Sequence, residues 1–303
     1  MYRSLRTLAP AIAVALASFS PATTAQTPDA TAAATPAPLL LSGDAGASWQ
    51  PLADGLPDDA QVRQVVDHAG TLYAAVTGEG LYVLPEGHST WQCRNAGLPQ
   101  RHDFPLLPTA LLHTGTRLVL GTFADGAFVS DDEGLTWRAA AGFEEEVVSA
   151  LHAVGDTLLA GTHTGVWRSL DGGSTWLEYV RTGGRVNALA SHGGRVLVAA
   201  QNEFGVLAGR SVSWSPTART DSAILQFLRE GEAAFAVTAS GTVYRSADGT
   251  NWLRNPVPLP LARPGALPAA LWAGYRPDVT DAGTYGLIYA TRRGWVMGAG
   301  GGC

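Results

Sequence analysis

The sequence predicts an all-β fold built from repeated four-stranded units, and three observations support this prediction. The first is an eight-residue pattern, S-x-D-x-G-x-[S/T]-W, found at residues 42–49, 130–137 and 169–176 and called the turn motif below. A copy one residue shorter spans residues 246–252, and degenerate copies span residues 84–91 and 207–214. The closing tryptophans recur every 38 to 46 residues, a period that indicates stacked or radially arranged supersecondary units.

The second observation is that short apolar runs alternate with glycine-containing turns, and the third is that helical periodicity is missing from the repeats. The fourth repeat shows the order of the parts. Its strands are expected at residues 147–154, 157–161, 166–169 and 176–180, with the turn motif between the last two. Four strands in each repeat of this length is the spacing of a β-propeller blade.

The turn motif is expected to connect the third and fourth strands of each unit. Its aspartate brings a short carboxylate to nearby backbone N–H groups, its glycines tolerate positive φ, and its hydroxyls add further partners. The closing tryptophan begins the fourth strand and supplies a large apolar surface. We therefore predict a structural, not catalytic, role for the motif aspartates Asp44, Asp132, Asp171 and Asp248.

The number of blades follows from aligning the second and third strands of the repeats. These align at residues 72–84, 118–130, 158–169, 196–207, 234–246 and 287–298. No turn motif follows the last pair, whereas the first motif has no first and second strands before it. The N-terminal strand is therefore expected to complete the C-terminal blade, which protects the sheet edges. This predicts six four-stranded blades with N- and C-terminal closure, and seven blades as the alternative.

The turn motif resembles the Asp-box, or bacterial neuraminidase (BNR) repeat, of sialidase-like β-propellers. Similar repeats occur in the sortilin ectodomain, some xyloglucanases and photosystem II assembly-factor propellers. The resemblance covers residues 42–298 and implies the fold but no particular activity, because enzymes and binding proteins share the repeat. Sialidases also carry an Arg-Ile-Pro-like motif ahead of the first box, but residues 26–42 contain no arginine. Sialidase activity is therefore not expected.

The ends of the chain predict export. Residues 1–25 have the features of a secretory signal peptide, because two arginines precede an apolar run and small residues precede the expected cleavage site. Residues 26–38 form an Ala/Thr/Pro-rich linker, and residues 39–303 form the propeller domain. We expect a monomeric bacterial protein, periplasmic or secreted, with no integral membrane segment after signal cleavage. Cys93 and Cys303 either pair or remain free thiols.

Composition excludes several other classes of function. The formal net charge is −6 and all 20 basic residues are arginines, so we expect no nucleic-acid partner, Schiff-base lysine or P-loop. One histidine recurs before the first turn of successive repeats, at His68, His113, His152 and His192. Such a distribution scatters the side chains around a ring, whereas zinc needs several ligands at one point. We therefore expect turn residues there, no metal and no cofactor.

The candidate ligand site is placed by the resemblance to sialidase-like propellers, in which the ligand face is opposite the Asp-boxes. Loops between second and third strands and between successive blades share that face. The candidate ligand-binding residues in these loops are Asp103, Asp125, His163, Arg181, Arg185, Glu203, Arg219, Arg292 and Arg293.

The favoured hypothesis is a non-catalytic exported propeller that binds a protein segment or a glycan on this face. One alternative is a carbohydrate-active enzyme, a glycoside hydrolase or lyase, that uses loop carboxylates such as Asp125 and Glu203. Another is an assembly-factor-like chaperone of an envelope or membrane complex. We assign no catalytic residue, and enzymatic activity stays an open alternative.

Overall fold

The structure is a computed structural model of the 303-residue chain. It describes residues 39–42, 50–100, 105–143, 146–230, 232–240, 242–254, 288–291 and 294–298. The chain divides into two compact units after Thr35, and all described residues belong to the second unit, residues 36–303. Every regular element in these ranges is a β-strand. Within them, no helix is long and apolar enough to cross a membrane.

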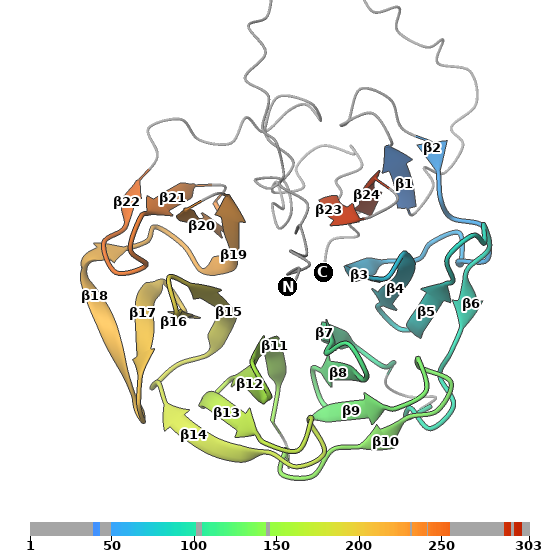
Figure 1. Ribbon diagram of the computed structural model, residues 1–303, viewed down its shortest axis with the longest axis horizontal. Coiled ribbons are helices and arrows are strands. Elements are labelled where there is room, and N and C mark those ends of the chain that lie inside the picture. Colours follow the sequence, from blue (N-terminus) through green and yellow to red (C-terminus); the bar gives the residue numbers. More distant parts are fainter. Residues whose placement is uncertain are drawn as a thin grey trace, which may run out of the picture. The chain divides into compact units, whose positions relative to one another are not determined.

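The described strands form six antiparallel four-stranded sheets (Figure 1). Sheet I has the order β2 (Gln50–Pro51), β1 (Leu39–Ser42), β24 (Gly294–Gly298) and β23 (Ile288–Thr291). Sheet II contains β3 (Val62–His68), β4 (Thr71–Val76), β5 (Gly80–Leu84) and β6 (Gln92–Cys93). Sheet III contains β7 (Pro108–His113), β8 (Leu118–Thr122), β9 (Ala127–Ser130) and β10 (Arg138–Ala139).

The other three sheets repeat this plan of four strands that are consecutive in the chain. Sheet IV contains β11 (Val148–Val154), β12 (Thr157–Thr162), β13 (Gly165–Ser169) and β14 (Leu177–Arg181). Sheet V contains β15 (Val186–His192), β16 (Arg195–Ala200), β17 (Glu203–Ala208) and β18 (Ser211–Arg219). Sheet VI contains β19 (Ile224–Glu230), β20 (Ala233–Thr238), β21 (Val243–Ser246) and β22 (Leu253–Arg254).

Neighbouring sheets contact each other through their first strands. β23 contacts β3, β3 contacts β7, and the series continues through β11 and β15 to β19. Four-stranded sheets that follow one another and meet at their first strands form a β-propeller, as the repeat spacing predicts.

Sheet I combines strands from both ends of the described chain. β1 pairs with β24, with Leu39 opposite Gly298 and Ser42 opposite Trp295. The sequence alignment assigned residues 287–298 to second and third strands, and the observed order corrects this assignment. β23 and β24 take the first and second places, because β1 occupies the third place beside β2.

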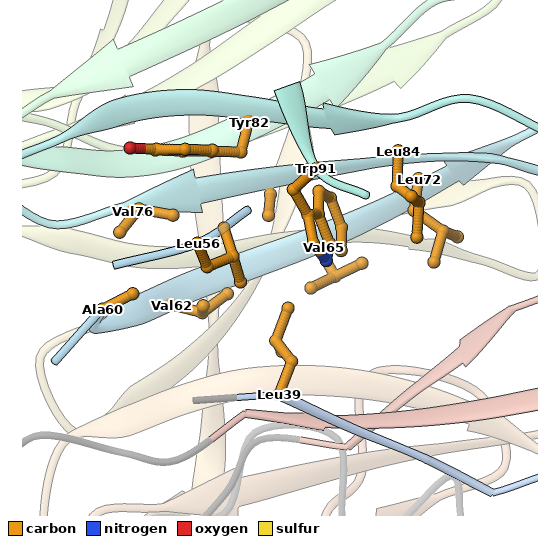
Figure 2. Packing of buried hydrophobic residues seen from close by; sticks show 11 residues of the cluster. Leu39, Leu56, Ala60, Val62, Val65, Leu72, Val76, Tyr82, Leu84 and Trp91 are labelled. Carbon is orange, nitrogen blue, oxygen red and sulfur yellow. The ribbon is translucent and has the colours of Figure 1, made fainter. Parts of the chain in front are cut away.

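The core lies between the sheets and explains why the middle strands are continuous apolar runs. β5 and β8 are buried along their whole length, because both faces of each sheet are covered by neighbouring sheets. Between sheets I and II, Leu39 of β1 packs with Leu56, Val65, Leu72 and Trp91 (Figure 2). The turn-motif tryptophan therefore belongs to the contact between two blades.

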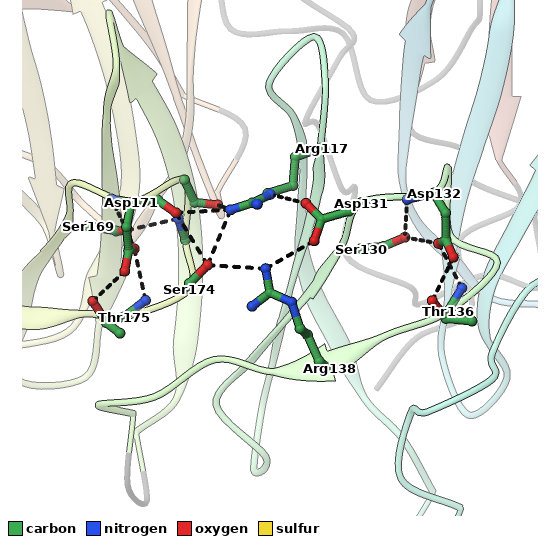
Figure 3. A network of polar contacts seen from close by, with 12 residues as sticks. Arg117, Ser130, Asp131, Asp132, Thr136, Arg138, Ser169, Asp171, Ser174 and Thr175 are labelled. Carbon is green, nitrogen blue, oxygen red and sulfur yellow. Dashed lines mark hydrogen bonds and ion pairs between the residues drawn. The ribbon is translucent and has the colours of Figure 1, made fainter.

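The turn motif closes on itself through its serine and aspartate (Figure 3). The Ser169 hydroxyl donates to Asp171 Oδ1 at 2.8 Å and accepts from the Gly173 N–H at 2.8 Å. Thr175 donates its N–H to Asp171 Oδ1 at 2.9 Å and its hydroxyl to Oδ2 at 2.7 Å. Although partial burial acts to raise it, these hydrogen bonds lower the pKa of Asp171 to about 2.

The same bonding recurs in two other copies of the turn motif. Asp132 accepts from Ser130 and Thr136, and Asp248 accepts from Ser246 and Thr250. Hydrogen bonds also hold the pKa of both carboxyl groups below the usual range. Asp44 of the first motif lies outside the described residues.

Candidate functional site

A cavity of about 620 Å³ lies where the first strands of five blades begin. Its lining comes from the starts of β3, β7, β11, β15 and β19 and from the residues just before β15 and β19. First strands run from the loop between blades toward their own first turn. The cavity is therefore nearer to the face opposite the turn motif, the face that the sequence analysis selected.

Each of these five strands has a β-bulge near its start. The ladder register shifts at the second residue of the strand, and all five of these residues line the cavity: Arg63, Thr109, Ser149, Asn187 and Leu225. A bulge inserts one unpaired residue and re-aims its side chain. Polar side chains near the starts of four of these strands thereby reach the cavity.

The lining of the cavity is positively charged. Arg63 and Arg185 both line it, and none of its described lining residues is an aspartate or glutamate. This contrasts with the formal net charge of −6 for the whole chain. Arginine binds carboxylates well because its planar guanidinium donates two parallel hydrogen bonds. The cavity therefore suits an anionic group that is attached to a larger ligand.

Of the loop residues that the sequence analysis selected, Arg185 lines this cavity. Several of the others form pairs of opposite charge outside its lining. Arg181 Nε donates to Glu178 Oε1 at 2.7 Å, and Arg219 Nη2 lies 2.8 Å from Glu203 Oε1. These loop arginines are therefore paired with carboxylates of nearby residues, on exposed parts of the blades.

His163 and Asp125 also lie outside the cavity lining. His163 Nδ1 lies 3.0 Å from Oε2 of the buried Glu146, which also accepts a hydrogen bond from Thr164. The backbone N–H of Asp125 donates to the Thr122 hydroxyl within the turn between β8 and β9.

Three selected residues, Asp103, Arg292 and Arg293, lie outside the described residues, as does Cys303. The strands before and after Arg292 and Arg293 are β23 and β24, the first and second of sheet I. The reason for placing these arginines between a second and a third strand therefore no longer holds. Cys93 is exposed and has a free thiol.

Two of the histidines expected to be scattered lie in direct contact, which corrects that expectation. The His68 and His113 rings stack with centroids 3.8 Å apart. His113 Nε2 lies 3.4 Å from a carboxylate oxygen of Glu133, which also accepts a hydrogen bond from Tyr73. Burial, and secondarily the charge of His68, lowers the pKa of His113. Within the described ranges, no three potential ligands are grouped as a metal site requires.

Four polar lining residues, Arg63, Gln64, Asn187 and Gln226, were not among the candidates predicted from the sequence, because they lie in strands and not in loops. All four line the cavity from first strands. A signal for them was present: polar residues occupy the second or third position of strands whose first five residues are otherwise apolar. This signal can be interpreted only when the bulge is known, because the bulge turns the side chains at these positions toward the cavity.

No protein-family model and no curated protein matches the chain. Among solved structures, it is similar to YCF48 from Cyanidioschyzon merolae, with a TM-score of 0.53 and 15% identity over 72% of this chain and 77% of that one. A structure of YCF48 bound to D1 peptide gives a TM-score of 0.50 and 16% identity, over 64% and 66% of the two chains. The computationally designed Ika8 protein gives 0.50 and 16%, over 70% and 69%. At these identities the likeness shows the fold alone.

Proposed function

We propose that the chain is a six-bladed propeller, closed by its two ends, that binds a protein segment in this cavity without catalysing a reaction. One observation carries the proposal: the described residues that line the cavity include Arg63 and Arg185 and no carboxylate side chain. A segment that presents a carboxylate would gain charge-assisted hydrogen bonds there. The signal-like residues 1–25 support export of the protein, by the periplasmic or secretory route.

The fold gives this proposal further support. A propeller of similar fold, YCF48, has been solved with D1 peptide bound to it. The backbone of a peptide segment can also use the amide and hydroxyl groups in the lining, which include those of Gln64, Ser149, Asn187 and Gln226. We favour a peptide over a glycan because apolar side chains such as Leu225 and Phe227 also line the cavity.

The test is binding by the mature chain, residues 26–303, to arrays of peptides and glycans. One peptide set carries a central glutamate with both ends blocked, and a matched set carries a central glutamine with a free C-terminus. These sets separate a side-chain carboxylate from a terminal one. An Arg185→Ala variant is compared with Arg181→Ala, whose guanidinium already pairs with Glu178 outside the cavity.

We expect Arg185→Ala to weaken binding of carboxylate peptides by at least about tenfold, since one hydrogen bond to a charged group contributes about 1.5–3 kcal/mol. Arg181→Ala should bind like the parent. Unchanged affinity of the Arg185 variant, or binding of glycans but no peptides, would contradict the proposal. Circular dichroism of both variants checks that the fold is retained.

A further inference from the structure

The described lining of the cavity changes from polar to apolar along the first strands. Its outer level, called the rim, consists of Arg185 just before β15 and the polar second residues of four strands, Arg63, Thr109, Ser149 and Asn187. Its inner level, called the floor, consists of the apolar fourth residues of four strands, Val65, Leu151, Leu189 and Phe227. Two residues along a strand span about 6 Å. The charged and the apolar parts of the lining therefore lie at different depths.

Small side chains occupy much of the level between the rim and the floor. The third residue of the first strand is alanine in sheets III, IV and V: Ala110, Ala150 and Ala188. Gln64 and Gln226 hold this position in sheets II and VI. The alanines extend no further than Cβ, so the walls formed by sheets III to V leave room for a side chain that passes from the rim to the floor.

The floor presents apolar surface at the edges of the core between sheets. Leu151 and Leu189 are half-buried and pack against two of the core clusters. Phe227 is held in place by aromatic neighbours, with ring centroids 6.2 Å from Phe204 and 5.6 Å from Trp252. An apolar group placed on the floor would gain free energy by removing the rest of this surface from water.

We infer that the segment bound in the cavity inserts a large apolar side chain onto the floor, while a carboxylate of the same segment stays at the rim with Arg185. The inference rests on the proposed function and specifies its ligand. That ligand is a peptide with an acidic residue within two positions of a residue such as leucine or phenylalanine. The cavity volume of about 620 Å³ lies in the range of ligand pockets.

The two levels also fix which group enters first. The exposed Arg185 can pair with a carboxylate at the rim, where water still reaches both groups. A carboxylate pushed down to the described floor residues would lose its water among apolar side chains, which is costly for a charged group. The polar backbone of the peptide lies beside the polar rim, and the apolar side chain points inward.

The first experiment varies the ligand and keeps the parent protein. Blocked heptapeptide mixtures carry glutamate at the centre and a guest residue at one of the two positions before or after it, with glycine and serine elsewhere. The guest is alanine, 2-aminobutyrate, norvaline or norleucine, so each step adds one methylene group. At one of the guest positions, we expect affinity for the mature chain to rise about threefold to fourfold per methylene. Affinity independent of guest length at every position would overturn the inference.

The second experiment changes the floor. Leu189→Asn makes it polar, and Leu207→Asn is the matched control, because Leu207 is a half-buried leucine on the same core cluster but outside the described lining. Leu189→Asn should remove most of the gain of norleucine over alanine, whereas Leu207→Asn should keep it. The same gain in Leu189→Asn as in the parent would contradict the role of the floor. Circular dichroism checks both folds, and the methylene series decides if a variant does not fold.

Decanoate tests another class of ligand, since it offers a carboxylate and an apolar chain without a peptide backbone. Decanoate that binds as tightly as the norleucine peptides, and is weakened equally by Leu189→Asn, would show that the floor holds an acyl chain and would overturn the inference. If no central-glutamate mixture binds, or if binding does not need Arg185, the proposed function itself fails. If binding needs Arg185 but ignores the guest residue, only the role of the floor fails.

Discussion

At the scale of single residues, the aspartates of the turn motif are already engaged within the protein. Both carboxylate oxygens of Asp171 accept hydrogen bonds, from Ser169 and from the N–H and hydroxyl of Thr175. The motif therefore explains how third and fourth strands are joined. The described carboxylates of the motif are directed to backbone N–H and hydroxyl groups of the turn.

Replacing Asp171 should destabilise the fold without affecting the proposed binding of a peptide. Asp171→Ala removes three hydrogen bonds from an exposed turn, and we expect the free energy of unfolding to fall by about 1–2 kcal/mol, the range measured for comparable capping residues. Asp156→Ala, in the exposed first turn of the same sheet, is the control and should change it little. Chemical denaturation measures both variants. Equal losses in the two would contradict this role.

The same residue predicts a dependence on pH. The folded pKa of Asp171 is about 2, below its ordinary value of 3.8. A group whose pKa is lowered by folding stabilises the folded state above its unfolded pKa, and this contribution is lost as pH falls through the folded pKa. The difference in stability between the parent and Asp171→Ala should thus be constant above about pH 5 and shrink from about pH 4 toward pH 2. A difference that grows on acidification would contradict this.

At the scale of elements, polar side chains connect the turns of neighbouring blades. Arg117, at the start of sheet III's second strand, donates to the carbonyls of Asp171 and Gly172 in sheet IV, at 2.9 and 3.1 Å (Figure 3). It also pairs with Asp131 of its own sheet. Arg138 approaches the same aspartate and Ser174 from β10. The turn motif is therefore part of the contact between blades as well as a strand connection.

Arg117→Ala should lower the free energy of unfolding by about 1–3 kcal/mol, because the two carbonyls lose a charged donor at a partly buried position. Arg117→Lys should recover only part of this loss, since an ammonium group cannot span the same acceptors. Exposed Arg210→Ala is the control. Thermal and urea unfolding distinguish the three variants, and full recovery by lysine would show that charge alone matters.

The elements also show which features the sequence could predict. The blades could be predicted from the turn motif, because hydrogen bonds and glycine conformations within its eight residues determine the conformation of the turn. Glu133 was less predictable: it adopts φ 58° where the next motif has Gly172, and it contacts His113 of its own sheet and Tyr73 across the contact with sheet II. Such a contact depends on how two sheets pack against each other, and the sequence of one repeat alone does not determine that packing.

The cavity illustrates the same limit on sequence reasoning. Arg185 was selected because it lies in a loop between blades, and the structure places it in the lining. Gln226 and Asn187 were missed because one bulge per strand reverses which face their side chains occupy, and a two-residue strand period does not reveal a single inserted residue. The repeat therefore predicts the fold. The candidate site depends instead on β-bulges, which interrupt the strict alternation of side chains along a strand.

At the scale of the whole molecule, the described chain joins its first strand to its last. Leu39 of β1 is fully buried among residues of sheet II, although its own sheet is completed by β23 and β24. If the sheets close into the proposed ring, every blade contact depends on the others, because opening one contact exposes two sheet faces. We therefore expect stability at the closing sheet to be coupled to stability elsewhere.

Leu39→Ala tests this coupling. Removing a fully buried leucine side chain should lower the free energy of unfolding by about 2–5 kcal/mol. Leu253→Ala is the control, since that side chain is 75% exposed. In a closed ring, fluorescence of the blade tryptophans and circular dichroism should report one shifted transition, because all sheets unfold together. Two separate transitions, with only one displaced by Leu39→Ala, would instead mean that sheet I is attached at the end of an open array. The cavity proposed to bind a peptide should then survive the loss of β1, since its described lining begins at β3 and ends at β19.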